Sequence, residues 1–182
     1  MAYVPLVLIA VVAGWFVAAY NRLVRLRNQI RNAWRQIDVQ LTRRHDLIPN
    51  LVEVVKDYMS YEQETLAKVI EARGVAVGAR GTAAQAKAEN ILTESLKSLF
   101  AVVENYPDLK ANRNVASLQE ELTGTENRIS FARQYYNDSV MTYNNAIQAI
   151  PGNFVASLFH FGAETYFEAD GRDREVPKAA LR

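Results

Sequence analysis

The sequence predicts an all-α protein, in which an N-terminal transmembrane helix is followed by an antiparallel, coiled-coil-like bundle of four long helices. The first observation is an uncharged apolar stretch from Tyr3 to Tyr20. The second is that apolar residues recur at alternating spacings of three and four through most of the remaining chain, which is typical of packed helices. The third is that no strand-like alternation extends over a useful length. Long helical stretches with short connections favour a bundle.

The apolar stretch, YVPLVLIAVVAGWFVAAY, has the composition of a membrane anchor. About 18 apolar residues are enough to cross a hydrocarbon core as a helix. Tyr3, Trp15 and Tyr20 are amphipathic aromatic residues of the kind that lie near lipid headgroups, and Arg22 and Arg25 follow directly. Since no Lys or Arg precedes the stretch, we expect the N-terminus outside and the rest of the chain in the cytoplasm.

Two alternatives to a membrane anchor are a cleaved signal peptide and a buried core helix. Val17 and Ala19 offer small residues around a cleavage site, but a signal peptide carries its basic residues before the apolar stretch. A core helix would also be apolar, yet the remaining chain has enough apolar residues to build a core without it. The anchor is therefore the favoured interpretation.

Composition limits the classes of partner and site. The net charge is +1, which gives no general electrostatic reason to bind nucleic acid. Cysteine is absent, which excludes disulfides, thiolate metal sites and a lipidated cysteine anchor. The chain length after the anchor suits one ordinary domain. We expect an anchor over 1–20, a cytoplasmic helical bundle over 21–150, and an amphipathic segment with a C-terminal tail over 151–182.

The first helix of the bundle is expected to continue directly from the anchor. It should end near Ile48, because a residue before proline is disfavoured in the α region, and Pro49 would then form a hairpin. The alternative is a kink at Pro49 in one continuous helix. The apolar stripe of this helix is Leu23, Leu26, Ile30, Ala33, Ile37 and Leu41.

Three further helices are expected. The second runs from Asn50 and stops in the glycine-containing stretch 74–81. The third begins with a capping box at Thr82 and is broken at Pro107. The fourth has Asn114 as its N-cap and ends before Pro151 and Gly152.

Four segments carry a resemblance to a known family: AWRQIDVQLTRRHDLIPNLVEVVKDY at 33–58, ENILTESLKSLFAVVENYPDLKAN at 89–112, LQEELTGTENRISFARQYYNDSVMTYN at 118–144, and YFEADGRDREVP at 166–177. The chain resembles the LemA family of bacterial membrane-anchored helical proteins. It departs from the family pattern at Arg35, at Val115 and in the tail after Pro177, which lacks an aromatic residue. The resemblance implies a single pass through the bacterial inner membrane, an outside N-terminus, a helical cytoplasmic domain and no established reaction.

The sequence contains no recognisable catalytic or cofactor-binding motif. A di-metal bundle site would need Glu three residues before His, but Thr42 precedes His45 and Ser157 precedes His160 at that spacing. Phosphate-binding loops and hydrolase elbows are also missing. We therefore expect no enzyme activity, no metal and no cofactor.

Charged residues gather beside the predicted hairpin at Pro49. In an up-and-down bundle this turn and the turn at Pro107 would both lie at the end remote from the membrane, where they could bind a partner. The alternative for the first group is a simple capped helix end, since His and Arg favour the last turn of a helix. The candidate partner-binding tip comprises Arg43, Arg44, His45, Asp46, Pro107, Asp108 and Lys110.

The segment after the fourth helix is a second candidate membrane contact. Phe154, Leu158 and Phe161 would return to the headgroup region if the helices alternate in direction. The alternative is that these side chains close the open end of the bundle. Tyr135 and Tyr143 suit either interhelical packing or a binding face.

The favoured function is that of a non-enzymatic, membrane-anchored interaction or scaffold protein that self-associates at the cytoplasmic face. Its expected partners are the lipid bilayer, further copies of itself and an unidentified membrane or cytoplasmic protein. A membrane-linked signalling or stress sensor is the alternative, and a metal-dependent enzyme is a weaker one. Self-association is expected because apolar residues exceed the need of one core, notably Leu47, Leu51, Val52, Val54, Val55, Phe131 and Tyr135.

Overall fold

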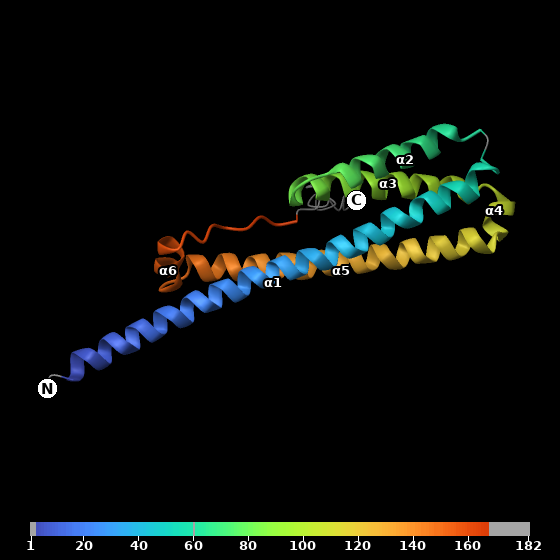
Figure 1. Ribbon diagram of the computed structural model, residues 1–182. Coiled ribbons are helices and arrows are strands. Elements are labelled where there is room, and N and C mark those ends of the chain that lie inside the picture. Colours follow the sequence, from blue (N-terminus) through green and yellow to red (C-terminus); the bar gives the residue numbers. More distant parts are fainter. Residues whose placement is uncertain (1–2, 60, 168–182) are drawn as a thin grey trace, which may run out of the picture. The chain divides into compact units, whose positions relative to one another are not determined.

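The computed structural model describes residues 3–59 and 61–167, and this part of the chain is all-α, as predicted (Figure 1). The predicted tail beyond 167 lies outside the described residues. The described helices are α1 (Tyr3–Lys56), α2 (Gln63–Gly78), α3 (Thr82–Val103), α4 (Pro107–Ala111), α5 (Arg113–Gln148) and α6 (Gly152–Leu158).

Helix α1 continues through Pro49 to Lys56, so the predicted hairpin at Ile48 is wrong. Proline lacks the N–H that would bond to the carbonyl four residues earlier, which belongs to His45. Arg73 of α2 replaces that donor, because its Nε donates to the His45 carbonyl at 2.7 Å. A side chain distant in sequence thus satisfies the backbone group that Pro49 leaves free, and the helix can continue.

This replacement predicts a coupling between Pro49 and Arg73. Pro49→Ala should raise the free energy of unfolding by about 1–3 kcal/mol, because proline is a poor residue for a helix interior. Arg73→Ala should cost about 1 kcal/mol in the natural chain but less in the Pro49→Ala background, where the new backbone N–H can reach the His45 carbonyl. Denaturant unfolding of the four variants in detergent, followed by circular dichroism, measures the coupling.

Arg80→Ala is the matched control for this cycle. Among the described residues, Arg80 donates to the nearby carbonyls of Val77 and Ala79 and not to His45, so its removal should cost the same in the natural chain and in the Pro49→Ala background. If Arg73→Ala also costs the same in both backgrounds, Arg73 does not replace the donor that Pro49 lacks.

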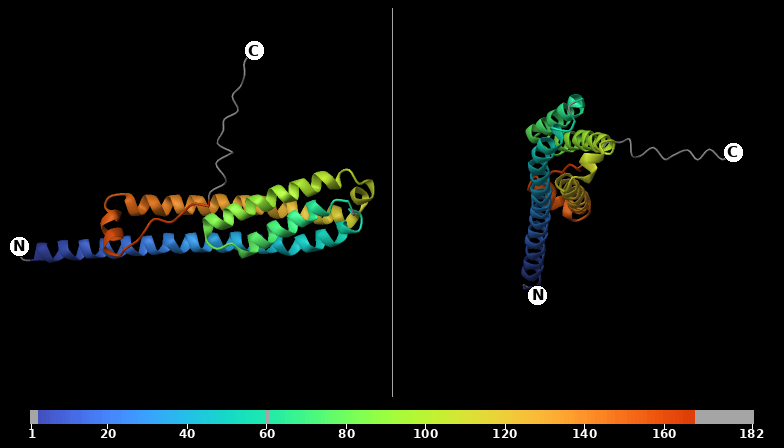
Figure 2. Two further views of the ribbon diagram at one scale, coloured as in Figure 1. Left: turned by 90° about the horizontal axis from the view of Figure 1, so that it is seen from above. Right: turned by 90° about the vertical axis from the view of Figure 1, so that its right-hand side faces the viewer.

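The described chain divides into two compact units. The first comprises residues 3–37 and 132–166, and the second comprises 38–59, 61–131 and 167. In the second unit the end of α1, the helices α2 and α3, and the first part of α5 surround one apolar core. Figure 2 shows α2 and α3 side by side, joined through Gly81, whose φ of 83° favours glycine. The core includes Ile48, Leu51, Val55, Val69, Leu92, Leu99, Leu109, Val115 and Leu122.

The first unit pairs the beginning of α1 with the last part of α5. Trp34 packs its ring edge-on against Tyr136, with ring centroids 5.7 Å apart. Gln29 donates a 3.2 Å hydrogen bond to the hydroxyl of Tyr135. Apolar side chains of α1 and α5 that are buried here at the predicted spacing include Leu23, Ile30, Ala33, Ile37, Val140 and Tyr143.

The helix caps differ from the sequence predictions. Gly81, rather than Thr82, is the N-cap of α3, and Gln85 donates to the Ala76 carbonyl at 3.1 Å instead of completing a capping box. Asn112, rather than Asn114, caps α5, since its Oδ1 accepts from the backbone N–H of Asn114 at 2.9 Å. These two predicted helix starts were thus placed within two residues of the observed caps.

Candidate functional site

A buried ionic network joins three helices of the second unit. The carboxylate of Glu89 on α3 is fully buried and lies 2.8 Å from His45 Nε2 and 3.5 Å from Arg44 Nη1, both on α1. Arg44 also lies 2.8 Å from Glu126 of α5 and donates to Thr93 at 2.7 Å. Because each buried charge has a partner of opposite charge or a hydrogen bond, the network can exist inside the core.

Helical spacing explains why these polar side chains face inward. Arg44 and His45 lie between the buried residues Leu41 and Ile48, and Glu89 lies one turn before Leu92. Gln85 supplies a further hydrogen bond to the Glu89 carboxylate at 2.9 Å. The carboxylate therefore receives donors from two helices, which holds α1 and α3 in one register.

The second site lies at the start of α1, in the first unit. Among the described helices, α1 is the one long and apolar enough to cross a membrane. Its apolar stretch is exposed, with Tyr3 80% and Trp15 41% accessible. Nothing in the described part of the chain covers most of this surface, which is the property of a helix that contacts lipid.

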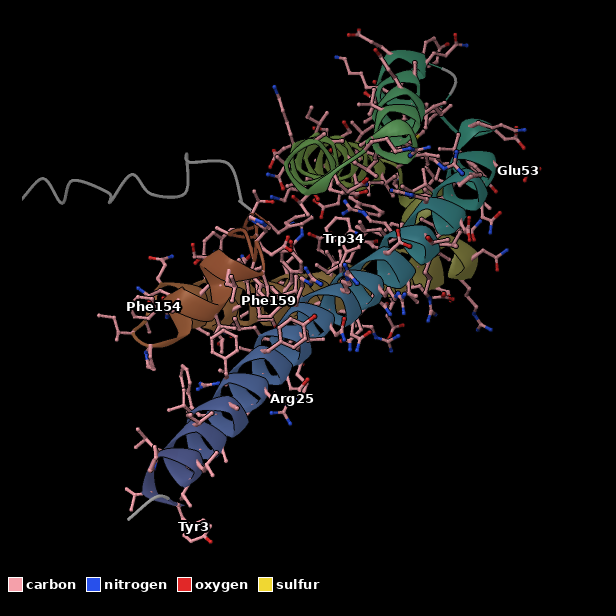
Figure 3. The ribbon with its side chains drawn as sticks, turned by 60° about the vertical axis from the view of Figure 1, so that its left-hand side comes forward. Tyr3, Arg25, Trp34, Glu53, Phe154 and Phe159 are labelled. Atoms are coloured by element: carbon pink, nitrogen blue, oxygen red, sulfur yellow. The ribbon has the colours of Figure 1, made fainter. Side chains whose placement is uncertain are left out.

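Aromatic residues after α6 pack on the end of this apolar stretch. The ring of Phe159 lies 6.0 Å from that of Phe16 and 4.7 Å from that of Tyr20, measured between centroids. Phe161 is buried, with its ring 5.6 Å from Tyr20 and 5.0 Å from the guanidinium of Arg27. Figure 3 shows Phe159 on the side of α6 that faces α1.

Hydrogen bonds fasten the segment after α6 to α5. Asn144 donates to the Glu164 carbonyl at 2.9 Å and accepts from the Glu164 N–H at 3.0 Å. The hydroxyl of Tyr143 donates to the Gly162 carbonyl and that of Tyr136 to the Thr165 carbonyl, both at 2.9 Å. Burial, followed by the charge of Glu164, raises the pKa of both phenols above the usual value, so they stay protonated as donors.

The sequence model of the LemA family matches residues 33–180, which is most of the chain. The chain belongs to the LemA family. The match contains Arg44, His45, Glu89 and Glu126, so the whole ionic network lies within the family region. The apolar beginning of α1 precedes it.

Curated relatives of this LemA family member are about one quarter identical. Magnetosome proteins MamQ 1 and MamQ 2 of Paramagnetospirillum magneticum are each 25% identical over 175 residues, covering 82% of this chain and 64% of the relative. Protein LemA of Metamycoplasma hominis is 25% identical over 169 residues, covering 92% of this chain and 77% of the relative. The chain thus spans less than two thirds of the length of the MamQ proteins.

The structure separates the residues of the predicted partner-binding tip. Residues 43–46 lie inside α1 rather than at a turn, because the helix continues through Pro49. Arg44 and His45 are buried in the ionic network, whereas Arg43 is exposed and pairs with Glu121 at 3.3 Å. Asp46 is exposed on α1, and the other three tip residues are exposed on α4. Partner binding by the exposed residues stays a prediction; those on α4 are Pro107, Asp108 and Lys110.

The predicted membrane contacts that follow α5 differ in how far their side chains are exposed. Phe154 and Leu158 are 64% and 62% exposed, so their contact with lipid stays a prediction. Phe161 is 8% exposed, and for this side chain the structure favours the alternative in which aromatic residues close the end of the bundle. Tyr20 provides the surface on which it packs.

Glu89 was missed as a site residue by the sequence reasoning. Its signal was present, because a charged residue that keeps the spacing of Leu92, Leu96 and Leu99 must face the core. The same test applied to Arg44 would have predicted a buried cation instead of an exposed tip. Pairing Glu89 with Arg44 by charge would have predicted that α1 and α3 are neighbours.

Proposed function

We propose that this LemA family chain is a single-pass, membrane-anchored interaction protein that acts as a self-associating scaffold at the cytoplasmic face of the bacterial inner membrane. The observation that carries the proposal is the exposed apolar beginning of α1, which continues without a break into the helical units. An anchor that continues directly into the helical region would tether this region to the membrane.

The charges beside the span support an outside N-terminus. Arg22, Arg25 and Arg27 follow the apolar stretch within about two helical turns. Cations next to a span favour the cytoplasmic side, where anionic lipids also attract them. The second unit would then lie in the cytoplasm.

Exposed apolar side chains of the second unit support self-association. Val39, Ile70 and Phe131 are 62%, 54% and 73% exposed. Fewer apolar side chains remain outside the core than the sequence predicts, because Leu51 and Val55 are fully buried in it. Large apolar side chains on a surface are candidates for contact with a second copy.

A single experiment can test both the orientation and the self-association, because the natural chain has no cysteine. In Phe131→Cys the thiol should react in intact cells with a membrane-permeant maleimide but not with an impermeant one. A permeant bismaleimide should also link two copies of this variant into a dimer. Labelling and cross-linking are read from gel mobility.

Two cysteine variants on α5 provide the controls. Ile129→Cys is buried and should remain unlabelled until the protein is denatured, whereas exposed Ser117→Cys should be labelled but cross-linked less than Phe131→Cys. Labelling of Phe131→Cys by the impermeant reagent would overturn the orientation. Dimer yields equal to those of Ser117→Cys would overturn self-association through this surface.

A further inference from the structure

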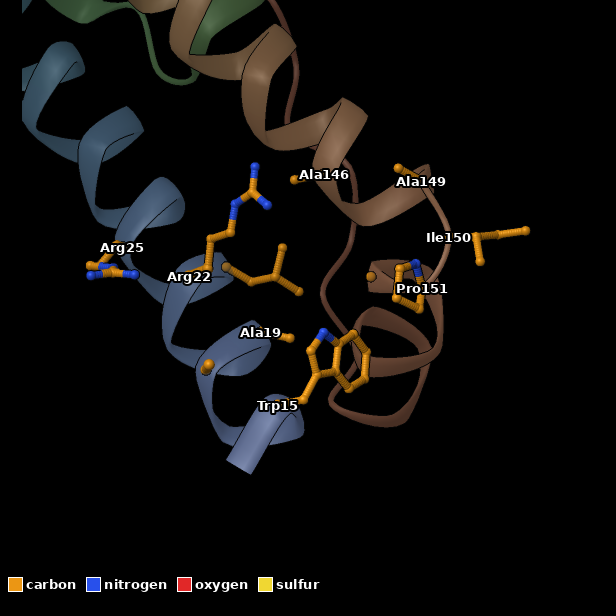
Figure 4. Close-up of a pocket in the computed structure, with 11 residues that line it drawn as sticks. Trp15, Ala19, Arg22, Arg25, Ala146, Ala149, Ile150 and Pro151 are labelled. Atoms are coloured by element: carbon orange, nitrogen blue, oxygen red, sulfur yellow. The ribbon is translucent and has the colours of Figure 1, made fainter. Parts of the chain in front are cut away.

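A cavity of about 400 Å³ lies within the first unit, between the beginning of α1 and the turn from α5 to α6 (Figure 4). Its α1 side runs from Trp15 to Arg25, which is from the apolar stretch into the cations that follow it. Its other side consists of Ala146 near the end of α5 and of residues 149–152 in the turn that follows. The cavity therefore has an apolar part and a cationic part.

The cationic part is not neutralised by the cavity wall. Among the residues that the structure describes, Arg22 and Arg25 line the cavity and no acidic residue does. Figure 4 shows the guanidinium of Arg22 directed toward Ala146, into the space between the helices, whereas Arg25 points away. In the described part of the chain, Arg22 has neither an ion pair nor a side-chain hydrogen bond. Its donors are available to an anion.

Small residues on the other wall create the space. Ala146 and Ala149 present only methyl groups to the cavity, and Gly152 begins α6. A Cβ at Gly152 would lie 2.5 Å from the Ala146 carbonyl oxygen, so glycine permits the close turn between the helices. The turn between α5 and α6 therefore lies near α1, while its small side chains leave the cavity open.

The aromatic contacts place this cavity at the end of the apolar stretch. Phe159 packs on Phe16 and Tyr20, which holds the turn beside the last part of that stretch. Trp15 and Arg22 are separated along the helix by about 10 Å. If the stretch spans the bilayer, Trp15 lies at the edge of the acyl chains and Arg22 lies at the level of lipid phosphates.

We propose that this cavity binds one anionic phospholipid. Arg22 pairs with the headgroup phosphate, for which a guanidinium offers parallel hydrogen bonds, and the beginning of an acyl chain lies against Trp15 and Ala19. The inference rests on the proposed membrane anchorage and adds a defined lipid site to it. A diffuse attraction of the membrane surface would depend on all nearby cations, whereas this site depends on Arg22.

Fluorescence of Trp15 in lipid nanodiscs tests the site in the full-length chain. Phosphatidylglycerol and phosphatidylcholine with brominated acyl chains are compared as quenchers at equal mole fraction in a phosphatidylcholine bilayer. Trp15→Phe gives the signal of Trp34, the other tryptophan, for subtraction. Brominated phosphatidylglycerol should show an apparent affinity for the Trp15 site about fivefold higher than brominated phosphatidylcholine.

Three variants distinguish lipid binding in the cavity from a general attraction of anionic lipid by the surrounding cations. Arg22→Gln removes the proposed phosphate ligand, and Ala149→Phe fills the cavity without changing any charge. Both should abolish the preference for phosphatidylglycerol. Arg31→Gln removes an exposed cation of α1 that does not line the cavity, and should preserve it.

The outcomes distinguish the lipid site from the anchor. Equal quenching by the two lipids, or an equal effect of Arg22→Gln and Arg31→Gln, would overturn the site while leaving the anchor intact. Absence of Trp15 quenching by either lipid would overturn the proposed membrane anchorage itself.

Discussion

Changing Glu89 to alanine is expected to lower the free energy of unfolding by about 3 kcal/mol. Removing one partner of a buried ion pair typically costs about 3–5 kcal/mol, because the other charge stays buried without compensation. The cost should be near the lower end of that range, since Arg44 keeps its 2.8 Å contact with Glu126. His45, however, loses the partner at 2.8 Å. Denaturant unfolding of the full chain in detergent measures the change.

Glu94→Ala provides a control on the same helix. Glu94 pairs with Lys97 at 3.3 Å, but both side chains are largely exposed, so its removal should change stability by less than about 0.5 kcal/mol. A combined change of Arg44, His45 and Glu89 to apolar residues should recover much of the loss, because it leaves no charge fully buried without a partner. Glu126, which loses Arg44 in this variant, is 39% exposed and can be hydrated. Equal effects of Glu89→Ala and Glu94→Ala would show that the network does not stabilise the fold.

Changing Phe161 to alanine should release the segment after α6 from the first unit. The buried ring packs on Tyr20 and Arg27, and truncating a buried phenylalanine costs about 3 kcal/mol or more. The amide of Glu164, which donates to Asn144, should then exchange its hydrogen about 100-fold faster. Hydrogen exchange of the full chain in detergent, followed by mass spectrometry, measures this opening.

Phe154→Ala is the matched control, because it also truncates a phenylalanine, but one on α6 whose side chain is 64% exposed. It should leave the exchange of the Glu164 amide nearly unchanged, since exposed substitutions seldom alter stability by more than about 0.5 kcal/mol. If both variants accelerate exchange equally, the contact of Phe161 with Tyr20 does not hold the segment. If neither does, the hydrogen bonds to α5 are sufficient on their own.

Much of the helical architecture could be predicted because its signals are local. The spacing of apolar residues correctly placed the inward faces of α3 and α5, including Leu92, Leu99 and Ile129. Pro107 correctly marked the break after the third helix, although the short helix α4 was not expected. The candidate sites were less predictable, since their residues take their roles from partners on other helices.

The sequence by itself determined the helical class, the apolar beginning of α1 and the family, because each depends on the order of neighbouring residues. Only the tertiary structure decided that α1 continues through Pro49, since the donor for the His45 carbonyl is 28 residues distant in the chain. It also decided that Arg44 is buried, since its partner Glu89 is 45 residues away. A polar backbone group or a charge can be buried without a large cost only where it has a hydrogen-bond or ion-pair partner. Tertiary packing brings such partners together from distant parts of the chain.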